Sequence, residues 1–199
     1  LSLAPSLTAF GNMVPISYLR LVPHQEAPTN ICWGDRNRSV LVRVPLGWLN
    51  VNNMTKDANP VEEEEAENGS ESQTIEFRCP DGSANIHLLM AGLAVAARHG
   101  LDREDAMELA EKLYVDVNIF NDDYKSIRDK LPHLPTSCWD SADHLAKDRE
   151  IYERDNVFPP IVIDGLIKSL KDYNDKDLSS KYYGKAEEIN KLVAEHFHC

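Results

Sequence analysis

Two short segments rich in strand-forming residues, 39–44 and 74–78, each place charged side chains on one face. Successive side chains of a strand point to opposite faces, so Arg43 lies opposite the valines of the first segment. In the second segment Glu76 and Arg78 share a face by the same alternation. We therefore expect a sheet with one apolar side against a core and one charged side lining a polar cavity.

Arginine is the common feature of the motifs around these segments. Five arginines fall within the first eighty residues: Arg20, Arg36, Arg38, Arg43 and Arg78. The guanidinium group offers a rigid fork of donors that matches carboxylate and phosphate geometry. Glu26 and Glu76 lie in the same motifs and could serve a metal ion or a proton. The pattern predicts a site for multiply charged anions, and phosphate is the anion it suits best.

Composition limits the classes of partner. The chain has 199 residues, 42% of them hydrophobic, and a formal net charge of −12, which argues against nucleic acid or an anionic membrane as partner. No apolar run reaches the roughly 18 residues of a membrane helix. Four scattered cysteines lack metal-ligand spacing and indicate reduced thiols, as expected of a cytoplasmic protein. The chain does not begin with methionine, and we interpret it as a fragment.

The chain divides into a strand-and-loop half, 1–85, and a mainly helical half, 86–199. Four prolines in residues 13–45 exclude long helices there. Residues 46–73 form a polar, acidic insertion that we interpret as a surface loop.

The helical half opens with residues 84–99, which are apolar almost all round. We therefore expect a buried helix that ends at Gly100. Further helices are expected from Asp102 and over residues 141–154, 160–173 and 179–197.

Three motifs in order carry a family resemblance: SYLRLVP with EAP (17–28), RNRS with RVP (36–45), and IEFRCPDGSAN (75–85). Together they resemble the C-terminal part of the glutamine synthetase catalytic domain. The resemblance implies an α/β (α+β) fold with an antiparallel curved sheet backed by helices. It also implies ligation of ammonia to glutamate with ATP through γ-glutamyl phosphate, in a homo-oligomeric ring.

The resemblance also implies roles for individual residues. Arg20 and Arg78 match arginines that bind the glutamate substrate. Glu26 matches a flap glutamate that helps take a proton from ammonium. Arg38 and Arg43 match arginines that face ATP and the acyl phosphate, and Arg38 is a catalytic candidate on that ground.

Metal binding is implied for Glu76, which matches a glutamate ligand of Mg²⁺ or Mn²⁺. The other metal ligands of the family belong to sequence that this chain does not contain, so we expect the isolated 199 residues to be inactive. Thr74 stands where many members have an arginine near ATP, and Gly82 replaces a turn proline. Tyr114 lies where some bacterial members carry an adenylylated tyrosine, but the surrounding residues differ.

Two alternatives stay open. The parent protein could ligate glutamate to a larger amine such as a polyamine, because these motifs barely distinguish acceptors. It could also be a non-enzymatic sensor or scaffold with the same fold.

Overall fold

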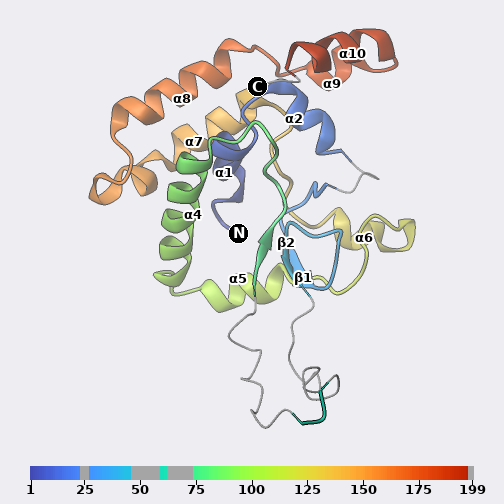
Figure 1. The fold of residues 1–199 in the computed structure, drawn as a ribbon, viewed down its shortest axis with the longest axis vertical. Helices are drawn as coiled ribbons and strands as arrows, with labels where there is room; N and C mark the ends of the chain where they lie inside the picture. Colours follow the sequence, from blue (N-terminus) through green and yellow to red (C-terminus); the bar gives the residue numbers. More distant parts are fainter. Residues whose placement is uncertain (23–26, 46–58, 62–73, 197–199) are drawn as a thin grey trace.

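The computed structural model describes residues 1–22, 27–45, 59–61 and 74–196. Two helices, α1 (Ala4–Gly11) and α2 (Pro15–Arg20), precede the strands β1 (Trp33–Asp35), β2 (Val42–Val44) and β3 (Glu76–Phe77) (Figure 1). The helices that follow are α4 (Ile86–Leu101), α5 (Ala106–Lys112), α6 (Lys125–Arg128), α7 (Cys138–Glu153), α8 (Pro160–Asp172), α9 (Leu178–Tyr182) and α10 (Ala186–Glu195), with 3-10 turns η2 (Asp122–Tyr124) and η3 (Arg154–Asn156).

The strands form one small sheet in the order β1-β2-β3. β2 and β3 are antiparallel, and Arg43 lies directly opposite Glu76. β1 and β2 are parallel, with Trp33 opposite Val42, a pairing that the expected antiparallel sheet did not include. The mixed α/β class and the two expected strand segments are confirmed, although the strands are shorter than the segments.

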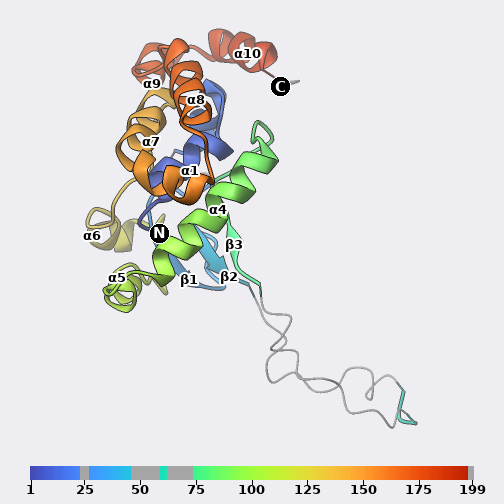
Figure 2. The same cartoon turned by 90° about the vertical axis from the view of Figure 1, so that its left-hand side faces the viewer.

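The core centres on α1, which packs between α7 and α4 (Figure 2). Phe10 of α1 lies 5.2 Å from the ring of Tyr152 and 5.1 Å from that of Phe158, measured between ring centroids. The hydroxyl groups of Thr8 and Ser141 form a hydrogen bond of 2.7 Å, so the polar side of α1 also contacts α7. This packing fixes α1 and the loop after it, which lead to α2.

The helix α4 differs from the expectation of full burial. Only Gly92 and Val95 are buried. A Cβ at Gly92 would lie 3.0 Å from the Phe10 ring, which shows how closely α1 approaches this one face. The opposite face is exposed, so the prediction of a helix buried all round is wrong for this chain. The helix also runs through Gly100 and ends at Leu101, so the predicted glycine cap is wrong.

The C-terminal region holds two helices where the sequence predicted one. Gly184 has φ of +75° and separates α9 from α10, because a left-handed residue cannot continue a right-handed helix. Residues 197–199 lie outside the described residues. Of the predicted insertion 46–73, residues 59–61 are described and exposed, and the rest lies outside the described part.

The helix α7 begins one turn earlier than predicted. Ser137 caps it, and its Oγ accepts a hydrogen bond of 3.0 Å from the Asp140 N–H. The buried carboxylate of Asp175 accepts two more, from the N–H groups of Cys138 at 2.8 Å and Trp139 at 3.0 Å. These acceptors satisfy donors that a helix start leaves free.

Within the described residues, no helix is long and apolar enough to cross a membrane.

Candidate active site

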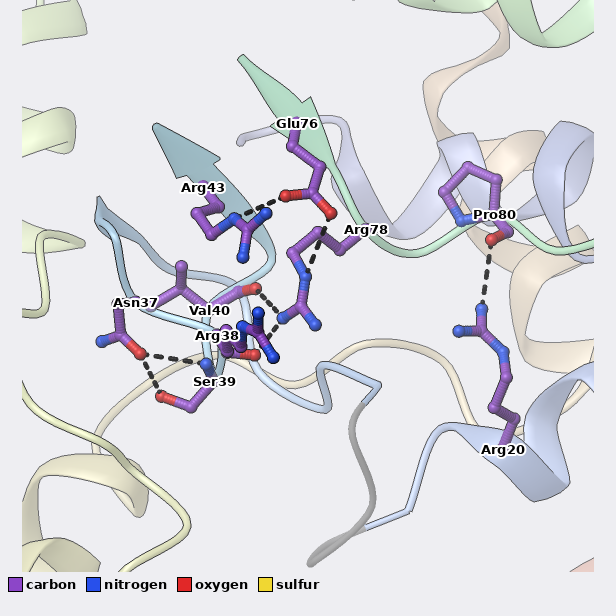
Figure 3. Close-up of polar contacts among 9 residues, drawn as sticks. All are labelled: Arg20, Asn37, Arg38, Ser39, Val40, Arg43, Glu76, Arg78 and Pro80. Atoms are coloured by element: carbon purple, nitrogen blue, oxygen red, sulfur yellow. Dashed lines mark hydrogen bonds and ion pairs between the residues drawn. The ribbon is translucent and has the colours of Figure 1, made fainter. Parts of the chain in front are cut away.

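Charged side chains from β2 and β3 meet on one face of the sheet (Figure 3). Arg43 Nε lies 2.5 Å from Glu76 Oε2, and Arg78 Nε lies 3.6 Å from Glu76 Oε1. The cross-strand pairing of Arg43 with Glu76 puts these groups side by side. The predicted common face for the three residues is confirmed.

Arg78 is held by the backbone as well as by Glu76. Its Nη1 donates to the carbonyl oxygens of Arg38 and, at 3.2 Å, of Val40. Both carbonyls belong to the segment that leads into β2. The guanidinium group therefore ties β3 to that segment and is fixed before any ligand arrives, which lowers the entropy lost on binding.

Arg20 reaches the same region from the end of α2. Its Nη2 donates to the carbonyl oxygen of Cys79. The same Nη2 donates to the carbonyl oxygen of Pro80 at 3.3 Å (Figure 3). Asn12 donates to the same Cys79 carbonyl at 2.9 Å, which fastens the chain after β3 to the end of α1. The Arg20 Nε is buried and finds no hydrogen-bond acceptor in the described residues. A buried donor of this kind favours a ligand that can accept from it.

A cavity of about 570 Å³ brings three of the predicted residues around one space. Arg20, Glu76 and Arg78 line it, together with Leu19, Ala27, Phe77 and Pro80. Positive groups outnumber negative ones here, although the whole chain has a net charge of −12. Such a local excess attracts anions and raises their local concentration.

Arg38 lies beside this cluster without an anchor for its own side chain. It is exposed, and its guanidinium has no hydrogen-bond or ion-pair partner among the described residues (Figure 3). Arg36 is also exposed and has φ of +56°. Arg38 therefore remains able to contact a ligand, whereas Arg43 and Arg78 are already paired.

Asn37 is a positioning residue that the sequence analysis missed. Its Oδ1 accepts hydrogen bonds from the Ser39 N–H at 2.9 Å and the Ser39 hydroxyl at 2.7 Å. Its Nδ2 donates to the carbonyls of Val115 at 3.2 Å and Val117 at 2.7 Å. The side chain thus holds the segment 36–39, which carries Arg36 and Arg38 and which we call the arginine loop, against the chain after α5. An Asn with Ser two residues later is a turn signal that could have indicated this role.

The candidate metal ligand Glu76 does not make a metal site by itself. Its carboxylate has the hard oxygen atoms that Mg²⁺ and Mn²⁺ prefer, but arginines contact both of them. Among the described residues no group of three or more His, Cys, Asp or Glu side chains could hold a metal ion. Glu26 lies outside the described residues.

Three further residues that the family resemblance singled out, Tyr114, Gly82 and Thr74, lie outside the charged cluster. Tyr114 packs edge-to-face on Trp33, with centroids 5.0 Å apart, so it contributes to packing at β1. Gly82 has open space where a side chain would stand, as expected at a tolerant turn. Thr74 is exposed just before β3.

Comparison with known proteins decides the family. The family model described as "Glutamine synthetase, catalytic domain" matches residues 1–181. The chain belongs to this family. Glutamine synthetase of Thermococcus kodakarensis is 33% identical over 87% of this chain and 32% of its own length. Glutamine synthetase of Mycolicibacterium smegmatis is 32% identical over 82% of this chain and 29% of its own. The chain thus spans about a third of these curated glutamine synthetases.

Solved structures support the fold. One described as a novel glutamine synthase homolog covers 92% of this chain with a TM-score of 0.57 and 22% identity. Another, described as a GmaS/ADP complex, covers 87% with a TM-score of 0.54 and 21% identity. This chain covers 36% and 34% of those structures. Its fold is therefore a part of the larger glutamine synthetase fold.

Proposed function

We propose that these 199 residues are the C-terminal part of the catalytic domain of a glutamine synthetase, which ligates ammonia to glutamate with ATP. The observation that carries the proposal is the shared cavity of Arg20, Glu76 and Arg78, with Arg43 paired to Glu76. A dicarboxylate and a nucleoside triphosphate are both multiply charged anions, and fixed guanidinium groups suit both. The enzyme would be cytoplasmic and would form a homo-oligomeric ring, as the family resemblance implies.

Arg20 and Arg78 would bind the carboxylates of glutamate. Each guanidinium is held by backbone carbonyls, so its direction is set by the fold rather than by the ligand. Arg43 would compensate charge on the phosphoryl group from its place beside Glu76. Arg38, whose side chain is unanchored among the described residues, would follow the phosphate as it moves.

The reaction would run in two steps. An oxygen of the glutamate γ-carboxylate attacks the γ-phosphorus of ATP, the bond to the bridging oxygen of ADP breaks, and γ-glutamyl phosphate forms. Ammonia then attacks the acyl carbon, and inorganic phosphate leaves. Glu26 would accept the proton that ammonium must lose before the attack. The arginines act on the first step by neutralising charge that builds on the phosphoryl oxygens.

A divalent ion would supply charge neutralisation at the phosphates when bound. The described residues offer it one carboxylate, Glu76, of the right chemistry but not a full set of ligands. In the whole protein the rest of the catalytic domain would supply the others. We therefore expect the 199-residue chain alone to be inactive.

The test is phosphate release from ATP by the whole protein with glutamate and Mg²⁺, offering ammonium and a panel of larger amines in separate reactions. We expect turnover that depends on ammonium and on glutamate, and none from the 199-residue chain. Turnover only with a larger amine would keep the fold but assign a sister ligase. Nucleotide binding without turnover on any amine would refute the enzymatic proposal and favour a sensor.

A further inference from the structure

A second cavity adjoins the candidate active site at Arg20. Its volume is about 310 Å³, and its polar lining is Ser17, Arg20, Asp81, Ser83 and His196. Arg20 also lines the larger cavity with Glu76 and Arg78, and neither of these two residues lines the second cavity. Arg20 therefore stands between the two spaces. We call the second one the His196 cavity.

His196 comes from a part of the chain that the family match does not include. The family model matches residues 1–181, and α10 spans Ala186–Glu195. Ile189, Leu192 and Val193 are half-buried on one face of α10, which indicates that this face packs on its neighbours. In both views α10 lies at the same end of the molecule as α2, the helix that carries Arg20 (Figure 1 and Figure 2). The chain thus brings to Arg20 a histidine from outside the matched residues.

The ring of His196 is supported on one side by an aromatic residue. It is half-buried and lies 5.9 Å from the Tyr173 ring, measured between ring centroids. Tyr173 directly follows α8, inside the family match. A neutral imidazole donates a hydrogen bond from one ring nitrogen, and a protonated imidazole donates from both. His196 can therefore act as a donor at the cavity in either protonation state.

The other polar walls of the His196 cavity are ordered by bonds within the chain. Asp81 Oδ1 accepts hydrogen bonds from the Ser83 N–H at 2.9 Å and from the Ser83 hydroxyl at 2.7 Å. The hydroxyl groups of Ser17 and Ser83 lie 3.2 Å apart. Arg20 Nη2 donates to two backbone carbonyls. A ligand that enters here meets groups whose positions are already set, which lowers the entropy lost on binding.

We propose that His196 is a specificity-determining residue that donates a hydrogen bond to the carboxylate held by Arg20, a role that rests on the proposed function. The two cavities give the order Arg78, Arg20, His196. Arg78 lies with Arg43 and Glu76, where phosphoryl transfer is proposed. The carboxylate at Arg20 is therefore the one that does not react, and His196 recognises that end of the amino acid.

Two other ligand classes fit the His196 cavity less well. Among the described residues that line it, Arg20 is the one guanidinium or ammonium group, and Asp81 carries the opposite charge. A polyphosphate is bound by several cationic groups, so it suits the larger cavity better. A metal ion lacks ligands here, because the described residues contain no group of three His, Cys, Asp or Glu side chains that could hold one. One carboxylate matches one guanidinium and one additional donor.

The test compares variants of the whole protein in phosphate release from ATP at varied glutamate, with the amine that supports turnover. His196→Ala removes the donor, and His196→Gln restores an N–H group. Lys191→Ala is the matched control, because Lys191 is an exposed basic residue of the same helix. We expect His196→Ala to raise the KM for glutamate about tenfold and to leave kcat within about twofold, since the lost contact is remote from the reacting carboxylate.

The Gln variant should recover most of this loss, and Lys191→Ala should behave as the unchanged protein does. An unchanged KM in His196→Ala, an equal rise in Lys191→Ala, or a Gln variant as weak as the Ala variant would overturn the role of His196. In each of these cases the continuing turnover would leave the proposed function intact.

Histidine modification by diethylpyrocarbonate measures binding without turnover. Tandem mass spectrometry separates modification of His196 from that of His198. Glutamate at ten times its Kd should slow the modification of His196 in the whole protein about tenfold, because about one site in eleven then remains free. His133, which lines a separate cavity, should keep its rate.

This measurement also separates the two proposals. If no amine supports turnover, the proposed function fails, and protection of His196 by glutamate would still support its contact with the carboxylate. Equal rates of His196 modification with and without glutamate would overturn that contact whether or not the protein turns over.

Discussion

Replacement of Gly34 by Ala should strongly destabilise the sheet that carries the arginine motif. A Cβ at this position in β1 would lie 2.1 Å from the carbonyl oxygen of Val115, a backbone atom. Side-chain carbons essentially never come within 3.0 Å of such an atom, so the two segments must separate by about 1 Å. The contact is bordered by hydrogen bonds from the Val115 N–H to the Trp33 carbonyl at 2.8 Å and from the Trp33 N–H to the Leu113 carbonyl at 3.0 Å. Asn37 also donates to the Val115 carbonyl.

The expected cost combines overpacking with lost hydrogen bonds. Overpacking in a tight site costs about 1–3 kcal/mol, and each weakened hydrogen bond costs about 1 kcal/mol. We therefore expect Gly34→Ala to lower the free energy of unfolding by about 3–5 kcal/mol. With a urea m-value of about 2 kcal/mol/M, the unfolding midpoint should fall by about 2 M. Tryptophan fluorescence suits the assay, because Trp33 lies next to the substitution.

Gly82→Ala is the matched control, since no heavy atom lies within 4 Å of its would-be Cβ. Its free energy of unfolding should stay within about 0.5 kcal/mol of that of the unchanged chain. If both variants unfold at the same urea concentration, β1 does not approach the backbone at Val115 as closely as the structure shows. That result would contradict the described contact between the arginine loop and the chain after α5.

Three further predictions concern caps, thiols and charges. Asp175→Asn should lower the free energy of unfolding by about 1–2 kcal/mol in urea titrations, because the buried carboxylate accepts two N–H groups at the start of α7. Burial raises the pKa of the Cys32 thiol to about 11 and that of the Cys79 thiol to about 12 in the folded chain. Above about pH 9 these thiols therefore lose their protons in the unfolded chain before they do so in the folded one. The free energy of unfolding should then fall by about 1.4 kcal/mol per pH unit for each thiol. Glu76→Gln should lower the free energy of unfolding by about 1 kcal/mol, since its carboxylate is 40% exposed and its ion pairs are partly screened.

Each of these has a matched control. Asp177→Asn, at an exposed residue close in sequence, should leave stability unchanged where Asp175→Asn does not. Cys32→Ala should remove the contribution of one thiol to the alkaline slope, and an unaltered slope would contradict the thiol assignment. Glu188→Gln disrupts the exposed ion pair between Lys185 and Glu188, 3.8 Å apart, and should hardly change the free energy of unfolding. If Glu76→Gln changes the free energy of unfolding no more than Glu188→Gln does, the ion pairs of Glu76 add no stability.

Local patterns in the sequence sufficed for the charged face of the sheet. Strand alternation alone put Glu76 and Arg78 together, and the structure adds Arg43 directly across the antiparallel pair. The parallel partner β1 could not be predicted in this way, because Trp33–Asp35 is short and its pairing with β2 depends on contacts between distant segments. The cavity that includes Arg20 likewise depends on α2 docking against the chain after β3.

Helix burial was predicted less well because it depends on what packs outside the helix. The apolar composition of α4 predicts a helix covered on both faces, but the described residues of this chain cover only one. The spacing of apolar residues predicted one continuous helix over 179–197. Gly184 breaks this helix through its positive φ, a backbone property that hydrophobic spacing does not reveal. Glu26 lies outside the described residues, so its role remains a prediction.

The most direct test of the proposed site compares two arginine variants of the whole protein in glutamate- and ammonium-dependent phosphate release. Arg78→Lys removes the guanidinium fork that contacts Glu76 and two carbonyl oxygens at the cavity. Arg98→Lys instead alters the ion pair between Arg98 on α4 and Asp155 in η3. We expect Arg78→Lys to lower kcat/KM for glutamate by about 100-fold and Arg98→Lys to leave it within about twofold. Unchanged kcat/KM in the Arg78 variant, or equal losses in both, would contradict the assignment of this cavity as the substrate site.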